Sequence, residues 1–523
     1  MPAFIPQKLK GLLQIFFLPL LAGILVPLGF APFRWPLCIY LGFAIFYQRI
    51  LKKKQSFWTG FAFGLGFFGF GISWVSNSIH DFGHLNYSVS FLLTFLLVCY
   101  LSLYTALCAC ALKWANQHLT ILWPPFTFAV LWTVFELLRA HLLGGFPWLL
   151  IGFSQIDTPL AHLLPLIGVY GTGFFAVWGA ALITEIFQTT GFSRMKRQLG
   201  FLSFFVIPVL LPTPELASGS KKNLSVAVIQ SNLSMRDKWD ESLYWQILSR
   251  YNEYISKTLR TGLIVLPESA IPLPVEYVEN YLEDIHKRAR KTDSAILLGI
   301  PQVINRDNVP VYYNSLQVLG HGAGQYLKQH LVPFGEYIPA PFSFLKKWEP
   351  LQSANLEAGS SRQKLPYAHN APFAALICYE LAFGEILRRQ LPLAQWIVSI
   401  SDDGWFGRSL APYQQQQMAQ VRSLQTGRYQ IMANNDGLSA VINAQGKVID
   451  SLPAFSSGLL LSRIVPMNGM TPWVRFGDWP VILFLGIILL LAGFLLDMGA
   501  LRGIGNILIL LVHNSSKHGL IFK

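Results

Sequence analysis

Long apolar stretches alternate with short basic links over the first 212 residues. These stretches fall at roughly 9–30, 36–51, 57–78, 88–112, 121–140, 159–188 and 199–212, and an eighth lies at 480–497. About twenty apolar residues are needed to cross the hydrocarbon core of a bilayer, so most of the stretches can span it, whereas the second and seventh are short. The pattern predicts a bundle of about eight membrane-spanning helices.

The first apolar stretch could be taken for a secretory signal, because Lys8 and Lys10 form a basic flank in front of it. No small-residue cleavage site follows it, however, and residues 32–36 lead directly into the second stretch. We therefore interpret the first stretch as a membrane anchor.

Basic residues mark every second link between the apolar stretches. They are Lys8, Lys10, Lys52, Lys53, Lys54, Lys113, Arg194, Lys196 and Arg197. Cytoplasmic loops carry an excess of Lys and Arg, so this alternation predicts a cytoplasmic N-terminus. Residues 213–475 then emerge on the far side after seven crossings. The last stretch returns the chain and leaves Arg502, Lys517 and Lys523 inside.

The region between the seventh and eighth stretches has a different pattern. Seven short apolar runs are typical of strands: 224–230, 263–267, 295–300, 314–319, 373–378, 396–401 and 438–443. Several are almost continuously apolar, as expected for strands buried on both faces. Amphipathic stretches at 241–260 and 276–291 predict helices between them. Alternation of strands and helices predicts an α/β layered domain.

Three parts of the chain follow from these patterns. Residues 1–212 would hold transmembrane helices one to seven, residues 213–475 an extracytoplasmic α/β domain, and residues 476–523 the last helix and a cytoplasmic tail. Residues 218–222, Ser-Gly-Ser-Lys-Lys, have the composition of a hinge into the second part.

Composition agrees with a membrane protein. Of the 523 residues, 53% are apolar and 13% are charged, against roughly 25% charged residues in an ordinary soluble domain. The formal charge of +13 raises the question of nucleic-acid binding. Lys and Arg lie mainly in the short links, however, and no patch combines basic and aromatic residues in a known binding motif. The sequence therefore argues against a nucleic-acid partner.

Five cysteines are present, and four of them lie within or beside the apolar stretches. Cys378 is the only cysteine after position 110, so it has no evident disulfide partner and no companion for a CxxC metal site. The histidines at 80, 84, 141 and 162 show no metal-ligand spacing. The sequence predicts neither a metal ion nor another cofactor.

Three residues capable of acid–base or nucleophilic chemistry stand at or near strand ends. Glu268 follows the apolar run LIVLP, Lys328 lies in YLKQH, and Cys378 ends the run FAALIC. The ends of parallel strands meet at one edge of a sheet, where α/β domains build active sites. Taken singly, the cysteine could be a core residue, the lysine a solvated surface residue, and the glutamate the cap of a helix beginning at 269.

The segments around these residues carry a resemblance to a known family. LPES at 266–269, YLKQHLVPFGEYIP at 326–339, ICYE at 377–380 and DDGWFG at 402–407 resemble the nitrilase superfamily. The flanking apolar stretches make the chain similar to the membrane-embedded branch, the apolipoprotein N-acyltransferase family. Matching segments in the helical part are FAPF at 30–33, GISWV at 71–75, GFPW at 145–148 and SQID at 154–157.

The resemblance implies an αββα sandwich in the periplasm, attached to the bacterial inner membrane. It implies roles for seven residues: Glu268 as base, Lys328 as the triad lysine, Cys378 as nucleophile, Glu336 as a second glutamate, Trp239 on a mobile arm, and Tyr379 and Glu380 beside the nucleophile. Glu336 could instead form only an ion pair with Lys328, and Trp239 could be an ordinary surface aromatic. One position departs from the family, which usually has histidine where this chain has Gln415.

The chemistry of these groups agrees with what the resemblance implies. Free cysteine has a pKa near 8.5, so a carboxylate must take its proton during attack on an ester, and an ammonium group can stabilise the resulting oxyanion. The implied reaction moves an acyl chain from a phospholipid, through a cysteine thioester, to the α-amine of a diacylglyceryl-cysteine at the N-terminus of a lipoprotein. The expected partners are therefore phospholipid, diacylated lipoprotein and the bilayer, with the enzyme working as a monomer. Two alternatives remain: a membrane-tethered nitrilase-type amidase or hydrolase, and a transporter or lipid-binding scaffold.

Overall fold

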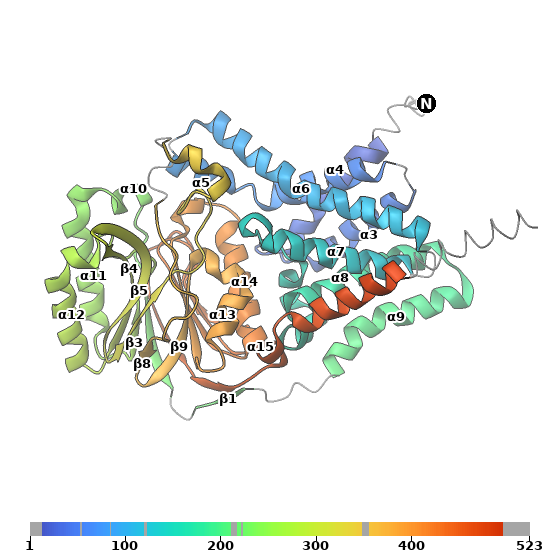
Figure 1. Cartoon of the computed structure of the whole chain (residues 1–523). Helices are drawn as coiled ribbons and strands as arrows, with labels where there is room; N and C mark the ends of the chain where they lie inside the picture. The colour runs from blue at the N-terminus through green and yellow to red at the C-terminus, as the bar shows by residue number, and fades with distance from the viewer. Residues whose placement is uncertain are drawn as a thin grey trace, which may run out of the picture.

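The computed structural model describes residues 13–52, 55–83, 85–119, 123–210, 217–220, 223–347 and 355–494. Figure 1 shows a body of helices beside a sandwich of β-sheets, with the final helix returning along the helical body. The predicted cytoplasmic tail, including Arg502, Lys517 and Lys523, lies outside the described residues.

The helical body is formed by the first half of the chain. Its helices are α2 (Leu18–Leu25), α3 (Pro36–Lys52), α4 (Ser56–Gly71), α5 (Val75–Gly83), α6 (Tyr87–His118), α7 (Pro124–His141), α8 (Leu164–Gln188) and α9 (Gly191–Leu210). Glycines let α4 approach its neighbours closely. A Cβ added at Gly66 would lie 2.1 Å from the carbonyl oxygen of Leu20, and one added at Gly60 would lie 2.5 Å from that of Thr105. Small residues at helix contacts are typical of packing in membranes.

Three described helices are long and apolar enough to cross a membrane: Tyr87–His118, Pro124–Gly144 and Pro159–Gln188. Helices α4 and α5 together would make a fourth, bent by 57°. Two further apolar helices, Ile15–Gly29 and Trp479–Phe494, are shorter. Helix α3 has only 17 residues, and α9 carries its basic residues in its first half. The part of the chain that the structure describes thus holds several helices suited to a membrane, but fewer than the eight predicted are long and apolar enough to cross one.

Two mixed sheets form the second part of the molecule. The six-stranded sheet has the order β14-β2-β3-β4-β5-β7, and the seven-stranded sheet the order β13-β12-β11-β10-β9-β8-β6. The strands of the first sheet are β2 (Leu224–Gln230), β3 (Leu263–Val265), β4 (Ala295–Arg306), β5 (Val309–Gly320), β7 (Gln325–Leu327) and β14 (Gly458–Ile464). Those of the second are β6 (Gly322–Ala323), β8 (Tyr367–Ala368), β9 (Ala371–Ile377), β10 (Trp396–Ser401), β11 (Gln430–Asn434), β12 (Ala440–Ile442) and β13 (Val448–Ser451).

Alternation of side chains along the strands gives four layers. On β9, Ala375 and Ile377 pack in the core between the two sheets, whereas Ala374 and Leu376 pack in the core on the opposite face of their sheet. Helices α11 (Tyr244–Thr258) and α12 (Glu279–Lys291) cover the six-stranded sheet. Helices α13 (Gly384–Gln390) and α14 (Ala411–Thr426) cover the seven-stranded sheet and separate it from the helical body (Figure 1). The predicted αββα sandwich is therefore present.

Ser218 and Gly219, at the start of the predicted hinge, instead pair with the end of the domain, and Lys221 and Lys222 lie outside the described residues. Strand β1 (Ala217–Gly219) runs antiparallel to β15 (Met467–Gly469), with Ser218 opposite Asn468. Because unpaired backbone donors are costly, two short polar segments gain by pairing even without a hydrophobic pattern. The segment that enters the sandwich, β1, is thus paired with the segment that leaves it, β15.

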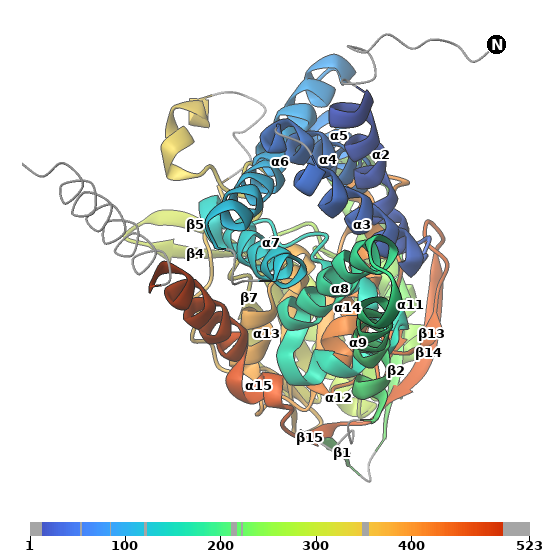
Figure 2. The same cartoon turned by 90° about the vertical axis from the view of Figure 1, so that its right-hand side faces the viewer.

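Helix α14 joins the sandwich to the helical body, and Figure 2 shows it beside α8. The indole N–H groups of Trp74 and Trp148 both donate to Gln414 Oε1, at 3.3 and 2.6 Å. Gln414 Nε2 donates in turn to the carbonyl oxygen of Gly71 at 3.1 Å, and the backbone N–H of Ala31 donates to Gln417 Oε1 at 3.0 Å. Buried glutamines on α14 therefore satisfy polar groups of the helical body and fix the two parts together.

Candidate active site

The predicted site residues follow strands in both sheets at the same end of the sandwich. Glu268 comes after β3, Lys328 directly after β7, and Cys378 directly after β9. Asp402 follows β10, which runs parallel to β9, so its loop lies at the same edge as Cys378. The convergence results from strand direction, because carboxyl ends of parallel strands share one edge.

The Glu268 carboxylate is buried, and both of its oxygens are held. Asn314 Nδ2 donates to Oε1 at 2.6 Å, and the backbone N–H of Asp402 donates to Oε2 at 3.1 Å. No helix begins at residue 269, and Ser269 has φ +44°, so Glu268 stands in a turn rather than capping a helix. Burial raises the pKa of Glu268, while the charge of Lys328 opposes this rise.

Gly299 on β4 permits the close approach of the backbone that carries Glu268. A Cβ added there would lie 2.5 Å from the carbonyl oxygen of Pro267 and 2.6 Å from the Cα of Glu268. Because both atoms belong to the backbone, we expect Gly299→Ala to cost about 1–3 kcal/mol of stability and to displace Glu268. Thermal unfolding and acyl-transfer rate would measure the two effects. Gly200→Ala is the matched control, since nothing lies within 4 Å of the added carbon there.

Lys328 is almost completely buried and lies between two carboxylates. Its Nζ donates to Glu336 Oε1 at 2.7 Å and lies 3.5 Å from Glu268 Oε1. Burial acts to lower the pKa of Lys328, but the charges of Glu336 and Glu268 outweigh it and raise the pKa above its usual value. The backbone N–H of Lys328 donates to the carbonyl oxygen of Asn314 at 2.9 Å. The side chain is therefore a fixed ammonium group rather than a solvated surface lysine.

Glu336 forms the ion pair with Lys328 that the sequence left as one alternative. Its second oxygen, Oε2, accepts from the backbone N–H of Val332 at 2.8 Å, and Asn314 Nδ2 lies 3.4 Å from Oε1. Glu336 thus shares two partners, Lys328 and Asn314, with Glu268. The structure brings the second glutamate into the same cluster.

Cys378 is the first residue of the short helix η10 (Cys378–Ala382) and stands in a strained turn directly after β9. Its φ of +53° lies in the left-handed region, which costs a non-glycine residue energy and is found at nucleophiles and ligand sites. Burial raises the pKa of the thiol well above its usual value; the charge of Glu268 adds to this, whereas that of Lys328 opposes it. The resting group is therefore a thiol that needs a base before it can attack.

Glu380 holds the lysine segment against the nucleophile turn. Its carboxylate accepts from the backbone N–H groups of Gln329 at 2.6 Å, His330 at 3.1 Å and Ile377 at 2.8 Å, and also from the hydroxyl of Tyr326. Burial raises its pKa to about 7, although these N–H groups oppose the rise. This arrangement indicates a residue that positions Lys328 relative to Cys378.

Tyr379 points from the nucleophile turn toward the helical body. Its hydroxyl donates to the carbonyl oxygen of Gly145 at 3.1 Å, and its ring stacks on Trp148 with centroids 6.3 Å apart. The GFPW segment singled out in the sequence therefore packs directly beside the site. This contact joins the membrane helices to the residue next to the nucleophile.

Trp239 follows the short helix α10 (Met235–Lys238), and its side chain is exposed. Its neighbour Lys238 is buried, donates to the backbone carbonyl oxygen of Glu268 at 2.8 Å and pairs with the Asp402 carboxylate. The arm that bears Trp239 is thus docked onto the site by its lysine. The sequence analysis did not single out Lys238 or Asp402, although Lys238 precedes Trp239 and Asp402 begins the segment DDGWFG.

Gln415 occupies a buried position beside the site. Its Nε2 lies 3.1 Å from the Ser401 hydroxyl, and Ser401 forms a hydrogen bond that acts on the Cys378 thiol. Turning the amide over lets its nitrogen donate to Asp403 Oδ1 at 2.8 Å while its oxygen accepts from Ser401. Gln415 is therefore linked to Cys378 through Ser401.

Transporters usually carry ionisable residues within their spans, and here Glu136 and Glu185 are the main acidic ones. Each has a partner on at least one carboxylate oxygen. Glu136 Oε1 accepts from the backbone N–H of Ile151 at 2.9 Å. Glu185 lies 3.3 Å from Arg197 and accepts from the hydroxyl of Tyr47 at 3.4 Å. Both carboxylates therefore stabilise contacts within the helical body.

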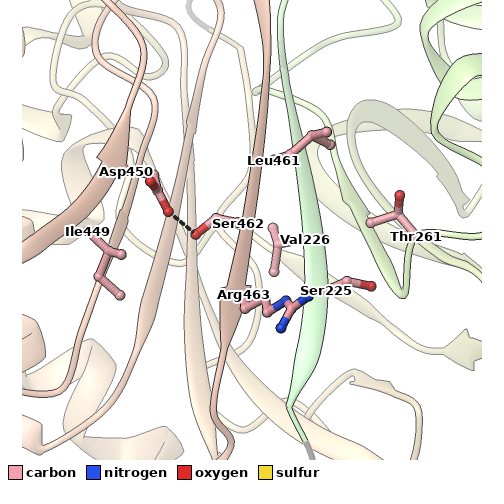
Figure 3. A pocket seen from close by; sticks show the side chains of 8 residues that line it. All are labelled: Ser225, Val226, Thr261, Ile449, Asp450, Leu461, Ser462 and Arg463. Carbon is pink, nitrogen blue, oxygen red and sulfur yellow. Dashed lines mark hydrogen bonds between the residues drawn. The ribbon is translucent and has the colours of Figure 1, made fainter.

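Two other features lie away from Cys378. Among the described residues, Asp293, His321 and His369 are the one set close enough to share a metal ion; they flank the starts of β4 and β9, at the opposite end of these strands from the site. A depression of about 460 Å³ lies beside β2, β13 and β14. Figure 3 shows the side chains that line it, among which Ser462 donates to Asp450. No predicted site residue lines the depression.

Comparison with known proteins identifies the family. A curated apolipoprotein N-acyltransferase from Coxiella burnetii is 36% identical over 484 residues, which cover 91% of this chain and 99% of that protein. This chain belongs to the apolipoprotein N-acyltransferase family. Members of the family from Azotobacter vinelandii and Pseudomonas aeruginosa are 36% and 34% identical, and the matches cover 92% and 91% of this chain and 94% of each relative.

The two halves of the structure correspond to two family models. Residues 22–182 match the apolipoprotein N-acyltransferase N-terminal domain, and residues 225–473 match the carbon–nitrogen hydrolase family. The first match falls on the helical body and the second on the sandwich. The family resemblance predicted from short motifs is thereby confirmed for the apolipoprotein N-acyltransferases, together with the nitrilase-like fold.

Proposed function

We propose that this chain moves an acyl chain from a phospholipid to the α-amine of the diacylglyceryl-cysteine at the N-terminus of lipoproteins, through a thioester on Cys378. The observation that carries the proposal is the cluster at the strand ends. A buried carboxylate and a buried ammonium group lie 3.5 Å apart and both act on the thiol. The names of the relatives, apolipoprotein N-acyltransferase, supply the reaction.

In the first half-reaction Glu268 takes the thiol proton as Cys378 Sγ attacks the ester carbonyl carbon. The ester oxygen becomes negative in the tetrahedral intermediate, and the Lys328 ammonium stabilises it. Collapse breaks the bond to the glycerol oxygen, which takes the proton from Glu268 and leaves as lysophospholipid. The acyl chain remains on sulfur as a thioester.

In the second half-reaction the amine of the lipoprotein attacks the thioester carbonyl. Glu268 accepts a proton from this amine, and the C–S bond breaks as the amide forms. The proton returns to the departing thiolate, which restores the resting site. An amide is more stable than the starting ester, so transfer proceeds without ATP.

The residues around the triad have supporting roles in this proposal. Glu336 keeps Lys328 charged and directed toward the reacting oxygen, and Glu380 fixes the lysine segment beside the nucleophile turn. Trp239 covers the bound acyl chain from its exposed position on the arm. The enzyme would work as a monomer.

The bilayer location supports the proposal, because both substrates are held in the membrane by acyl chains. Extracting a chain would cost about 0.8 kcal/mol per CH₂, and a membrane enzyme avoids this cost. Large apolar side chains on α6 face outward, as expected for contact with lipid: Phe91, Leu92, Phe95 and Leu96. We propose that eight helices cross the inner membrane, with the N-terminus in the cytoplasm and the sandwich in the periplasm, as the basic links indicate.

Incubation of the purified protein with a defined phospholipid and a diacylglyceryl-cysteine peptide tests the proposal. We expect the peptide to gain one acyl chain and lysophospholipid to appear in equal amount, both measured by mass spectrometry. A peptide with an acetylated N-terminus is the control and should remain unchanged. Release of free fatty acid without acylated peptide would favour the hydrolase alternative instead.

A further inference from the structure

Lys238 and Asp402 form a buried ion pair directly behind Glu268. Each side chain is 1% exposed, and Lys238 Nζ pairs with Asp402 Oδ2. We propose that Lys238 and Asp402 are positioning residues that hold Glu268 in register with Cys378 and set the charge around it. This inference rests on the proposed function of Glu268 as the base.

The two residues hold Glu268 at two separate points, one through the Lys238 side chain and one through the backbone of Asp402. Lys238 Nζ donates to the backbone carbonyl oxygen of Glu268 at 2.8 Å, and the backbone N–H of Asp402 donates to its carboxylate Oε2 at 3.1 Å. Because Ser269 has φ +44°, the turn after Glu268 is strained and needs such restraint. Lys238 thus fixes where the backbone lies, and Asp402 fixes where the carboxylate points.

Asp402 is itself held rigidly. Its Oδ1 accepts from Asn435 Nδ2 at 3.0 Å and from the backbone N–H of Gly404 at 3.2 Å, and its other oxygen accepts from Lys238. Asn435 also donates to the carbonyl oxygen of Leu233, just before the arm. The pair therefore joins the arm bearing Trp239, the loop after β10 and the turn of Glu268 in one network.

Stability alone gives little reason to bury this pair. Taking two charges out of water costs several kcal/mol per ion, and well-packed apolar residues of similar size often do as well. Two of the donors in the network end on Glu268 itself. Its arrangement around one carboxyl residue indicates a role in placing that residue.

The charges near the base give the pair a second effect. The titratable groups that interact electrostatically with Glu268 are Lys328, Glu336, Asp402 and the Cys378 thiol. Asp402 is faced in turn by Lys238, Asp403, Asp436 and Tyr251. Removing Lys238 leaves the charge of Asp402 uncompensated beside Glu268, which favours the protonated, inactive base. Removing the charge of Asp402 while Lys238 remains has the opposite effect.

Two single variants therefore shift the pH profile in opposite directions. Lysophospholipid release in the presence of the diacylglyceryl-cysteine peptide is measured against pH for wild type, Lys238→Met, Asp402→Asn and the double variant. We expect Lys238→Met to lower kcat about 10²-fold, as displacement of a catalytic group does. It should also move the acidic limb of the profile, where the rate falls with falling pH, to higher pH. Asp402→Asn should move it to lower pH. The acidic limb of the double variant, which lacks both charges, should lie between those of the two single variants.

Lys257→Met is the matched control, because Lys257 forms an exposed ion pair with Glu253 on α11. It should keep the wild-type rate and profile. Thermal unfolding shows whether each variant is folded, and if Lys238→Met is not, the shift in Asp402→Asn decides. Acidic limbs that coincide with wild type in the folded variants would overturn the inference, even if their rates fell. A wild-type protein that releases no lysophospholipid would refute the proposed function instead.

Discussion

Replacing Cys378 by alanine is expected to lower lysophospholipid release by about 10⁴-fold or more, because no neighbouring group can take over as nucleophile. Lys328 is held as an ammonium between two carboxylates. The Ser401 hydroxyl donates to Asp403 Oδ1 at 2.9 Å, and a hydroxyl is a much weaker nucleophile than a thiolate. Release is measured from labelled phospholipid at saturating concentration. The fold should survive, since the change removes one sulfur atom.

Cys99→Ala provides the control for the loss of a thiol. Cys99 lies on α6 and is partly exposed, far along the chain from the site. Its variant should keep the wild-type rate. If Cys378→Ala retained more than a small fraction of that rate while Cys99→Ala did not, the nucleophile would have to lie in the helices.

Replacing Glu268 by glutamine should lower the rate about 10²–10⁴-fold, the usual contribution of a general base. Glutamine keeps the size of the side chain and can still accept from Asn314 or Asp402, but it takes up no proton. Burial raises the pKa of Glu268, so in wild type the base is lost as pH falls, at higher pH than for an exposed glutamate. The variant should lack this acidic limb altogether, which rates measured across pH would show.

An exposed glutamate on α12, Glu283, supplies the comparison for this change. Glu283→Gln removes a surface ion pair with Lys287 and should leave both rate and pH profile as in wild type. A Glu268→Gln variant that kept its acidic limb would assign that limb to another group and remove Glu268 from the role of base.

Much of the sandwich could be predicted because its central strands are buried on both faces. Strands β2 and β10 have the predicted bounds. Both are buried along nearly their whole length, so the apolar run in the sequence coincides with the strand. Strand β14 was missed. It runs along the sheet edge with alternating burial, and its pairing with β2 depends on a partner more than two hundred residues away.

Membrane helices were harder to delimit. Hydropathy located the apolar stretches, but α9 begins at Gly191 and includes the basic residues that the sequence placed in a link. Helix propensity continues through Arg and Lys, whereas apolar character does not. The positions of the ends therefore depend on capping and packing as well as on hydropathy.

The active site, too, could be predicted only in part from the sequence. Motifs brought Glu268, Lys328 and Cys378 to attention, and strand ends explain why they meet. Lys238 and Asp402 are ordinary charged residues in sequence, and only the structure reveals that both are buried against Glu268. From sequence alone, a lysine in a short polar segment is expected to be solvated, and its burial depends on how that segment folds against the site.

Intact-mass spectrometry of the protein after exposure to phospholipid alone tests the central claim most directly. Wild type should gain the mass of one acyl chain, which hydroxylamine removes, and peptide mapping should place it on Cys378. Adding the diacylglyceryl peptide should discharge it. An acyl gain that persists in Cys378→Ala, or a wild-type protein that never carries one, would contradict the thioester mechanism.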